Sequence, residues 1–444
     1  MIQTFVGAEV YLPGEITDTT VTMDSGTIVE IGGPVQGLEI DARGKILAPA
    51  LIDVHGDAFE RQMMPRPGVY FPTETALIDT DRQLAANGIA TAYHAITLGW
   101  EPGLRDVSRG RELMQAMQGL TPRLTVENRV QLRWETFAFE ALDAIEWALK
   151  GPLLPSVAFN DHTSMTMRAY DVPIQDRAFE LSPDFSIASL DDERMKKRTA
   201  SKAHRAGLSE KDYIALLGKV WARRGDVPGA IAKVAKMARE AGAPMLSHDD
   251  TRAETRAYFR DLGASVAEFP MVMEAAEAAR AGGDLIIFGA PNAVRGGSHI
   301  GSLGAGDMVE AGLCDALASD YFYPAMLAAI DRLDREKRAD RLALWSLVSN
   351  GPARAMWLDD RGEITTGKRA DLVLVDWPQG QTPAIQGAAS SSSPWWAPSC
   401  HLSIRKAGSK RSWRKLPNRL PRPSPQCSMS TCPVRCSGPS RSWG

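Results

Sequence analysis

The chain has little cysteine outside its last segment. Of its five cysteines, only Cys314 lies within the first 386 residues, and the others are Cys400, Cys427, Cys432 and Cys436. A disulfide framework for the main fold is therefore excluded. No apolar run approaches the roughly 18 residues that a membrane-spanning helix needs. The first residues, MIQTFVGAEVYLPGE, also lack the order of a signal peptide, so we expect a cytoplasmic protein without a membrane partner.

Acidic residues are missing from the last 58 residues, which contain ten Lys or Arg and no Asp or Glu. The formal net charge of -3 therefore hides an acidic body, in which 41 basic side chains stand against 54 acidic ones. Nucleic-acid-binding domains usually carry a basic face, so we expect no nucleic-acid partner for the body. The length of 444 residues, with 44% hydrophobic residues, suits two to three globular domains or one large barrel with an appendage.

Residues 387–444 also differ from the body in composition, with 14 Ser, 8 Pro and no helical or strand period. Such a segment is typical of a disordered basic arm. Its cysteines lack the paired spacing of common zinc sites. We favour a reading-frame shift near residue 385, because GKRADLVLVDWPQGQTPAI is regular strand sequence whose pattern stops there. An intact single frame at the DNA level would exclude that hypothesis.

The body alternates between two kinds of pattern. Residues 1–46 and 358–386 show short strand-like alternation with Pro-Gly, Ser-Gly and Gly-Gly turns, which predicts a small β domain built from both ends of the chain. Residues 47–357 alternate short apolar runs with helical stretches. This alternation over some 300 residues predicts an α/β fold, a (β/α)8 TIM-like barrel.

Histidines follow three of the predicted strands. His55 and Asp57 end LAPALIDVHGD, and alternate residues of a strand point to the same side, so both can hold one cation. His162 ends SVAFNDH and His248 ends PMLSH. A surface turn or a satisfied structural histidine is the ordinary alternative for each. Three histidines at three strand ends favour a divalent metal site, with zinc as the first candidate and one or two ions.

Two carboxylates complete this candidate site. Asp320 ends CDALASD and can bind the metal and accept a proton from water, although Ser-Asp at a strand end is equally a helix cap. Glu135 ends VQLRWE and can bridge two ions, or it can be a solvated partner of Arg133. His204 is expected at the surface unless its long segment folds over the site as a lid.

A glycine-rich segment, GAPNAVRGGSHIGSLGA, follows the predicted strand DLIIF. Such loops present backbone N–H groups to anions, and this one adds Arg295, Ser298 and His299, although an ordinary loop remains the alternative. Further arginines follow the first and second histidine strands. They are suited to phosphate binding or to surface salt bridges, and together these groups predict a phosphorylated small-molecule substrate. The arginines are Arg61, Arg66 and Arg168.

Taken together, residues 3–376 resemble the metal-dependent amidohydrolase superfamily. The features are the interrupted β domain, LAPALIDVHGD, the strand-end histidines, Asp320 and the closing GKRADLVLVD. More narrowly, the chain is similar to the α-D-ribose 1-methylphosphonate 5-triphosphate diphosphatases of the carbon-phosphorus lyase pathway. That similarity rests on His-x-Asp, ERQMMPRPGVYFP, NDHTSMTMR, LSHDDT and AEFPMVMEAAEAARAGGDLIIFGAPNAVRGGSHIGSLGA.

The resemblance implies release of pyrophosphate from a ribosyl 5-triphosphate, with the 5-phosphate retained. It implies a metal-binding set in which Glu135 is the bridge. The implied set is His55, Asp57, Glu135, His162, His248 and Asp320. The sequence does not determine the oligomeric state and leaves a homo-oligomer open. Two alternatives stay open: hydrolysis of a C–N bond by a deacetylase or cyclic-amide hydrolase, and a non-enzymatic assembly protein that retained the fold.

Overall fold

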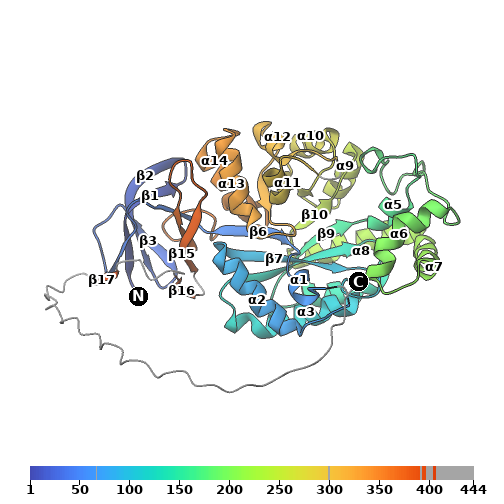
Figure 1. The fold of residues 1–444 in the computed structure, drawn as a ribbon, viewed down its shortest axis with the longest axis horizontal. Coiled ribbons are helices and arrows are strands. Elements are labelled where there is room, and N and C mark those ends of the chain that lie inside the picture. The colour runs from blue at the N-terminus through green and yellow to red at the C-terminus, as the bar shows by residue number, and fades with distance from the viewer. Residues whose placement is uncertain (67, 299–300, 391–392, 397–403, 407–444) are drawn as a thin grey trace, which may run out of the picture. The chain divides into compact units, whose positions relative to one another are not determined.

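The computed structural model describes residues 1–66, 68–298, 301–390, 393–396 and 404–406. The chain divides into two units, Met1–Ala407 and Gly408–Gly444, and the second lies outside the described residues. The first unit contains a barrel of strands surrounded by helices and a separate β sheet (Figure 1). Among the described residues, no helix is both long and apolar enough to cross a membrane.

Eight parallel strands form the barrel in the order β13-β12-β11-β10-β9-β8-β7-β6. This arrangement confirms the predicted (β/α)8 barrel. The strands are β6 (Leu51–Gly56), β7 (Ile89–Leu98), β8 (Glu127–Glu135), β9 (Ser156–Asn160), β10 (Met245–His248), β11 (Val266–Glu268), β12 (Leu285–Gly289) and β13 (Ala316–Ala318).

The barrel closes between its first and last strands. The backbone N–H of Asp320 donates to the His55 carbonyl at 2.8 Å. Asp53 on β6 accepts from the backbone N–H and the hydroxyl of Ser319, at 2.9 and 2.5 Å. A Cβ at Gly56 would lie 2.6 Å from Asp53 Oδ2 and 3.0 Å from Ser319 Oγ, so only glycine fits this close approach. The closure therefore brings His55 and Asp320 to one edge of the barrel.

Helices cover the outside of the barrel because each has one apolar stripe. In α8, for example, the buried residues recur three or four positions apart, and the helix ends at Gly242 in the left-handed conformation. The longer helices are α2 (Thr73–Ala86), α3 (Val107–Leu120), α4 (Leu142–Leu149), α6 (Glu193–Arg205), α7 (Glu210–Trp221), α8 (Val227–Ala241), α9 (Ala253–Asp261), α10 (Met273–Ala281) and α13 (Ala325–Arg335). The shorter ones are α1 (Glu60–Met63), α5 (His162–Met167), α11 (Ala290–Arg295), α12 (Ala305–Glu310), α14 (Arg341–Ser346) and α15 (Asn350–Ala355).

The second sheet joins the two ends of the body, as the sequence predicts. Its path is β16-β15-β14-β5-β1-β2-β3, and β4 pairs with β1 and β17. The buried side chains of Phe5, Leu47 and Leu374 belong to its core. The strands are β1 (Gln3–Leu12), β2 (Glu15–Asp24), β3 (Thr27–Ile31), β4 (Leu38–Asp41), β5 (Ile46–Pro49), β14 (Leu372–Asp376), β15 (Ala384–Ser390), β16 (Ser393–Trp396) and β17 (Ile404–Lys406).

The ends of this sheet differ from the expected boundaries at residues 46 and 386. Strand β5 crosses the first boundary, because ILAPALI is one continuous apolar run that hides the passage from the sheet to the barrel. Strand β15 crosses the second boundary, and β17 pairs antiparallel with β4. Most of residues 387–444 lies outside the described residues, so the predicted irregular basic tail stays a prediction.

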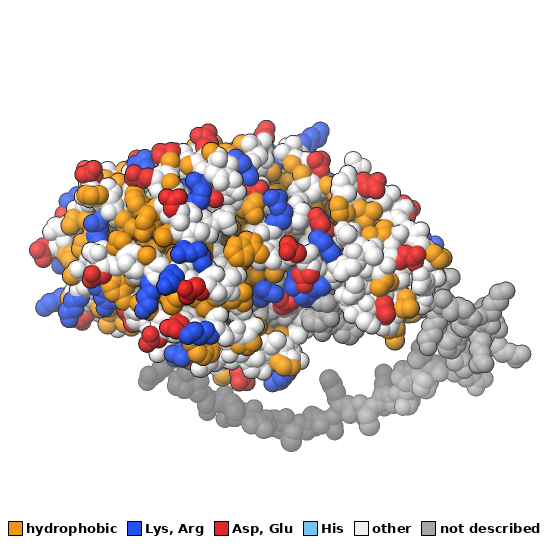
Figure 2. Space-filling view, turned by 180° about the vertical axis from the view of Figure 1, so that it is seen from behind, with side chains coloured by type: hydrophobic (Ala, Val, Ile, Leu, Met, Phe, Trp, Pro, Cys, Tyr) orange, Lys and Arg blue, Asp and Glu red, His pale blue; other side chains and the backbone are white. Residues whose placement is uncertain are grey.

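Basic and acidic side chains are interspersed over the described surface. Figure 2 shows blue and red side chains lying next to one another on the face opposite to that of Figure 1. Many of them form ion pairs between neighbouring turns of a helix, such as Lys150 with Glu146 and Arg332 with Glu336. The polar side chains at the barrel mouth differ from these because several of them are buried.

Candidate metal centre

The carboxyl ends of the barrel strands bring the predicted metal-binding side chains to one mouth. Three of them are the last or next-to-last residues of their strands: His55 on β6, Glu135 on β8 and His248 on β10. Asp57, His162 and Asp320 follow the ends of β6, β9 and β13. In a (β/α)8 barrel this end of the strands is where active sites lie.

One group of possible ligands consists of His55, His248 and Glu268, whose ligand atoms lie within 4.8 Å of one another. His55 Nδ1 is 2.9 Å from Glu268 Oε1, and His248 Nε2 is 3.7 Å from Glu268 Oε2. All three side chains are buried. Among the described residues, His248 Nε2 and Glu268 Oε2 have no hydrogen-bond partner. Buried polar atoms are rarely left unsatisfied, and a nitrogen and an oxygen that face each other in this way fit a divalent cation.

The second group consists of His55, Asp57 and Asp320, so His55 belongs to both. Asp57 Oδ2 also lies 3.3 Å from Arg133 Nη1 and 3.5 Å from Arg105 Nη2. Asp320 has a left-handed backbone, with φ of 54°. Burial raises the pKa of Asp320 to about 6, and the neighbouring Asp57 acts in the same direction against the effect of His55. The carboxyl of Asp320 is therefore poised to exchange a proton near neutral pH.

Glu135 and His162 form a pair beside these groups. His162 Nδ1 lies 2.5 Å from Glu135 Oε1, and the backbone N–H of His162 donates to Glu135 Oε2 at 3.1 Å. Burial tends to raise the pKa of Glu135, but His162 and Lys202 outweigh it and lower the pKa to about 2. Glu135 is therefore an anion over the whole physiological pH range, which is the form in which a carboxylate binds a metal.

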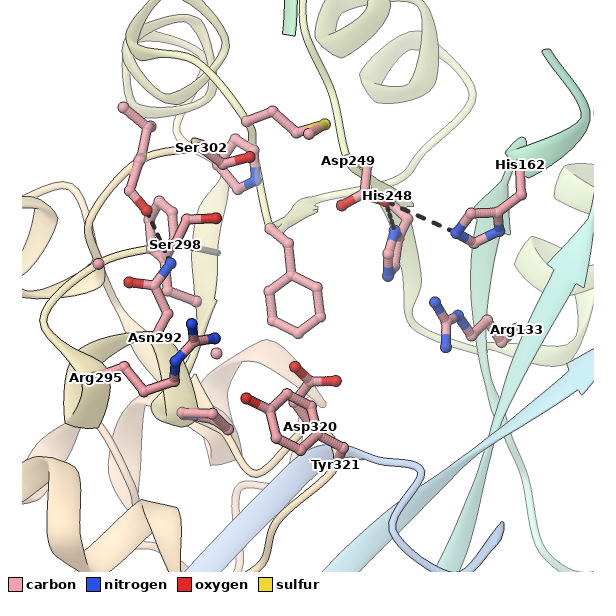
Figure 3. Close-up of a pocket in the computed structure, with 18 residues that line it drawn as sticks. Arg133, His162, His248, Asp249, Asn292, Arg295, Ser298, Ser302, Asp320 and Tyr321 are labelled. Carbon is pink, nitrogen blue, oxygen red and sulfur yellow. Dashed lines mark hydrogen bonds and ion pairs between the residues drawn. The ribbon is translucent and has the colours of Figure 1, made fainter. Parts of the chain in front are cut away.

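Asp249 connects this pair with the first group. Its Oδ2 lies 3.0 Å from His248 Nδ1 and 3.9 Å from His162 Nε2, and the dashed lines in Figure 3 join Asp249 to both rings. Burial raises the pKa of Asp249, but the histidines lower it further than burial raises it. Burial lowers the pKa of His248, which favours the neutral imidazole that metals bind. Asp249 thus helps to hold both rings in place.

Sequence reasoning missed Glu268, Asp249 and Arg133. Glu268 ends β11 in the same way as Glu135 ends β8, so the strand-end rule could have found it, but β11 is only three residues long and is hidden by the apolar residues on both sides. Asp249 follows a predicted ligand directly. The sequence suggests Arg133 only as a partner of Glu135, whereas its guanidinium contacts Asp57 and Asn160 Oδ1 at 3.3 Å.

A cavity of about 330 Å³ opens beside these groups. His162, His248, Asp249 and Arg133 lie on one side of it, and Arg295, Asn292 and Ser298 lie on the other, with Asp320 between them (Figure 3). Phe269, Met271 and Tyr321 add apolar surface to its walls. The cavity therefore joins the candidate metal groups to part of the glycine-rich segment that follows β12.

The structure brings only some of the predicted substrate-binding residues to this cavity. Arg295 and Ser298 line it, and His299 lies outside the described residues. Arg61 and Arg66 are exposed and line no part of this cavity. The Arg61 guanidinium instead packs over the Phe322 ring.

The Arg168 guanidinium binds the backbone of its own loop. Its Nη1 donates to the Met165 carbonyl at 2.6 Å and its Nε donates to the Val172 carbonyl at 3.0 Å. Two of the guanidinium nitrogens that could bind a phosphate thus already donate to backbone carbonyls. The local sequence does not reveal these contacts, because they depend on the path of the loop.

Comparison with known proteins places the chain in a family. It is 31% identical over 346 residues to the α-D-ribose 1-methylphosphonate 5-triphosphate diphosphatase of Escherichia coli (strain K12). The aligned region covers 76% of this chain and 84% of that protein. The chain belongs to this diphosphatase family, within the amidohydrolase superfamily. No family model matches the chain. The members of this superfamily use divalent metals, and the group formed by His55, His248 and Glu268 is a candidate site for one.

Solved structures share the fold of this amidohydrolase chain at low sequence identity. A Xaa-Pro dipeptidase has a TM-score of 0.57 at 12% identity and covers 89% of this chain and 100% of its own. Molinate hydrolase has a TM-score of 0.55 at 14% identity and covers 88% of this chain and 94% of its own. A D-hydantoinase has a TM-score of 0.51 at 13% identity and covers 92% of this chain and 98% of its own. These likenesses establish the barrel with its attached sheet.

Proposed function

We propose that the chain hydrolyses α-D-ribose 1-methylphosphonate 5-triphosphate to the 5-phosphate and pyrophosphate, with one or two divalent ions, zinc being the first candidate. The P–O bond between the α and β phosphates breaks, and one of the two fragments gains the oxygen of water. The single observation that carries this proposal is the 31% identity to the E. coli diphosphatase over three quarters of the chain.

The chemistry of the cavity supports the proposal. Metal ions, when bound, polarise the phosphoryl group and make water a stronger acid. The residues that would hold them are His55, His248 and Glu268 on one side and Asp57 and Asp320 on the other, with Glu135 and His162 as further ligands. An Asp320 carboxyl with a pKa of about 6 is ionised at neutral pH and can accept a proton from the attacking water.

The far side of the cavity suits an anionic substrate. The Arg295 guanidinium, at the end of α11, lines the cavity opposite the histidines and makes no ion pair among the described residues. A free guanidinium binds phosphate or phosphonate oxygens through planar N–H donors. A neutral amide substrate would leave this charge unused, which argues for the phosphoric anhydride over the C–N bond.

Metal analysis combined with a substrate panel tests the proposal. Purified protein is expected to bind a divalent ion and to release pyrophosphate from the ribosyl triphosphate, but no amine or carboxylate from cyclic amides and N-acetyl compounds. His248→Ala should lower the bound metal and abolish pyrophosphate release. His204→Ala, at an exposed position on α6, is the matched control and should change neither. Hydrolysis of the amides alone would replace the proposal by the C–N alternative.

A further inference from the structure

A second cavity of about 250 Å³ lies behind His162. His162 lines both this cavity and the larger one, so its ring is a shared wall between them. In Figure 3 His162 stands at the edge of the larger cavity, on the opposite side from Arg295. Helix α6, which belongs to the long segment between β9 and β10, contributes Lys202 and Arg205 to the second cavity. His204 on the same helix is exposed, so the helix contacts the second cavity through Lys202 and Arg205 and not through His204.

The second cavity is lined by three cationic side chains, of which Lys202 alone makes no ion pair among the described residues. Lys202 Nζ donates to the neutral hydroxyl of Thr166 at 2.7 Å. A lysine ammonium has three N–H donors, so further donors are available to an anion. Arg205 Nη2 lies 3.4 Å from Glu101 Oε2, and its side chain is 39% exposed. Arg105 differs, because it makes two hydrogen bonds to Glu60 at 2.7 and 2.8 Å.

The two carboxylates of this cavity already have partners. Glu101 accepts a hydrogen bond from the Tyr213 hydroxyl and lies near Arg205. Glu135 is held by the ring and the backbone N–H of His162. The hydroxyl of Thr163 is a further polar group of the lining residues, and it accepts from the Trp100 indole at 2.8 Å. Both carboxylates attract the Lys202 ammonium by charge, but neither forms an ion pair with it among the described residues, so an anion from solution can bind there.

We infer that this second cavity binds the β and γ phosphates of the substrate, the part that leaves as pyrophosphate, while the larger cavity binds the phosphoribosyl phosphonate. The inference rests on the proposed function. The smaller cavity suits the smaller and more highly charged fragment. The larger one combines apolar walls at Phe269 and Tyr321, which suit a sugar ring, with Arg295 for a terminal phosphonate. The bond that breaks would then lie between them, beside Glu135 and His162.

Binding of inorganic pyrophosphate to the metal-loaded enzyme tests this assignment without turnover. Calorimetry should show that Lys202→Met weakens pyrophosphate binding about tenfold or more, the usual loss when a hydrogen bond to a charged group is removed. Arg205→Met, at a more exposed position, should weaken it in the same direction. Lys197→Met is the matched control, because Lys197 is exposed on the same helix, and it should leave the affinity unchanged.

A second ligand separates the two cavities. Binding of ribose 1-methylphosphonate 5-phosphate should be weakened by Arg295→Met and should be unaffected by Lys202→Met. Pyrophosphate affinity that equals the wild-type value in both the Lys202 and the Arg205 variant would overturn the assignment, and so would a wild-type enzyme that does not bind pyrophosphate. If pyrophosphate binding depends on Lys202 but no triphosphate is hydrolysed, the anion subsite stands and the proposed function fails. If hydrolysis occurs as proposed with pyrophosphate binding insensitive to Lys202 and Arg205, only the subsite fails.

Discussion

His55 Nδ1 and Glu268 Oε1 lie 2.9 Å apart and join the first and sixth strands of the barrel within its buried interior. Gln131 on the third strand donates to the same Glu268 oxygen at 2.8 Å, which leaves Oε2 facing His248. Burial opposes the ionisation of both partners. Their mutual attraction outweighs it, so the pKa of His55 is raised and the pKa of Glu268 is lowered.

Glu268→Gln should lower metal affinity, because the amide keeps the volume of the side chain but loses the negative charge that a divalent cation needs. We expect a clear drop in metal bound per chain after dialysis against a weak chelator, measured by elemental analysis. Glu277→Gln on the exposed face of α10 is the matched control. Equal metal content in the two variants would remove Glu268 from the candidate site.

Arg295→Met should weaken the transition state for hydrolysis by roughly 1.5 to 3 kcal/mol, the usual range for hydrogen bonds to charged groups. The sequence predicts the same effect for Arg66→Met, but Arg66 is exposed and lines no part of the cavity. The kcat/KM for the ribosyl triphosphate should therefore fall far more in the Arg295 variant. A larger loss in the Arg66 variant would place the substrate on the other side of the barrel mouth.

Asp320→Asn should separate proton transfer from metal binding. Asparagine keeps the size and one ligating oxygen but cannot take a proton, so the rate should fall about 10²- to 10⁴-fold while metal content falls only modestly. The acidic limb of the pH-rate profile should also disappear or move. If activity and metal content fall in proportion, Asp320 acts chiefly as a ligand, and Glu135 becomes the next residue to test as the proton acceptor.

The same substitution should change how the stability of the metal-free protein depends on pH. The pKa of Asp320 is raised from its ordinary value of 3.8 to about 6 by burial, so the folded state favours the protonated form. This contribution is present below pH 4 and is lost as the pH rises to about 6. An asparagine side chain carries no charge, so the advantage of the Asp320→Asn variant over wild type should grow across that window, by at most about 3 kcal/mol. Urea unfolding at pH 4 and pH 7 measures it, and a constant difference would contradict the raised pKa.

The barrel and its interrupted sheet could be predicted because their signals are local. Apolar strand runs end in polar residues such as His55 and His248, and those ends meet wherever parallel strands close into a barrel. The contacts of a long side chain depend on the paths of the loops around it, and no local sequence pattern predicts those paths. Arg168 therefore binds two backbone carbonyls, and Lys202 reaches a cavity beside His162 from a helix 40 residues further along the chain.

Phosphorus NMR of the products tests the central claim most directly. Metal-loaded enzyme is incubated with α-D-ribose 1-methylphosphonate 5-triphosphate, with His248→Ala as the negative control and His204→Ala as the matched one. The account predicts equal amounts of pyrophosphate and ribose 1-methylphosphonate 5-phosphate, with an intact phosphonate signal and no reaction after chelation of the metal. Release of orthophosphate in place of pyrophosphate, or an unchanged triphosphate in the presence of metal, would contradict it.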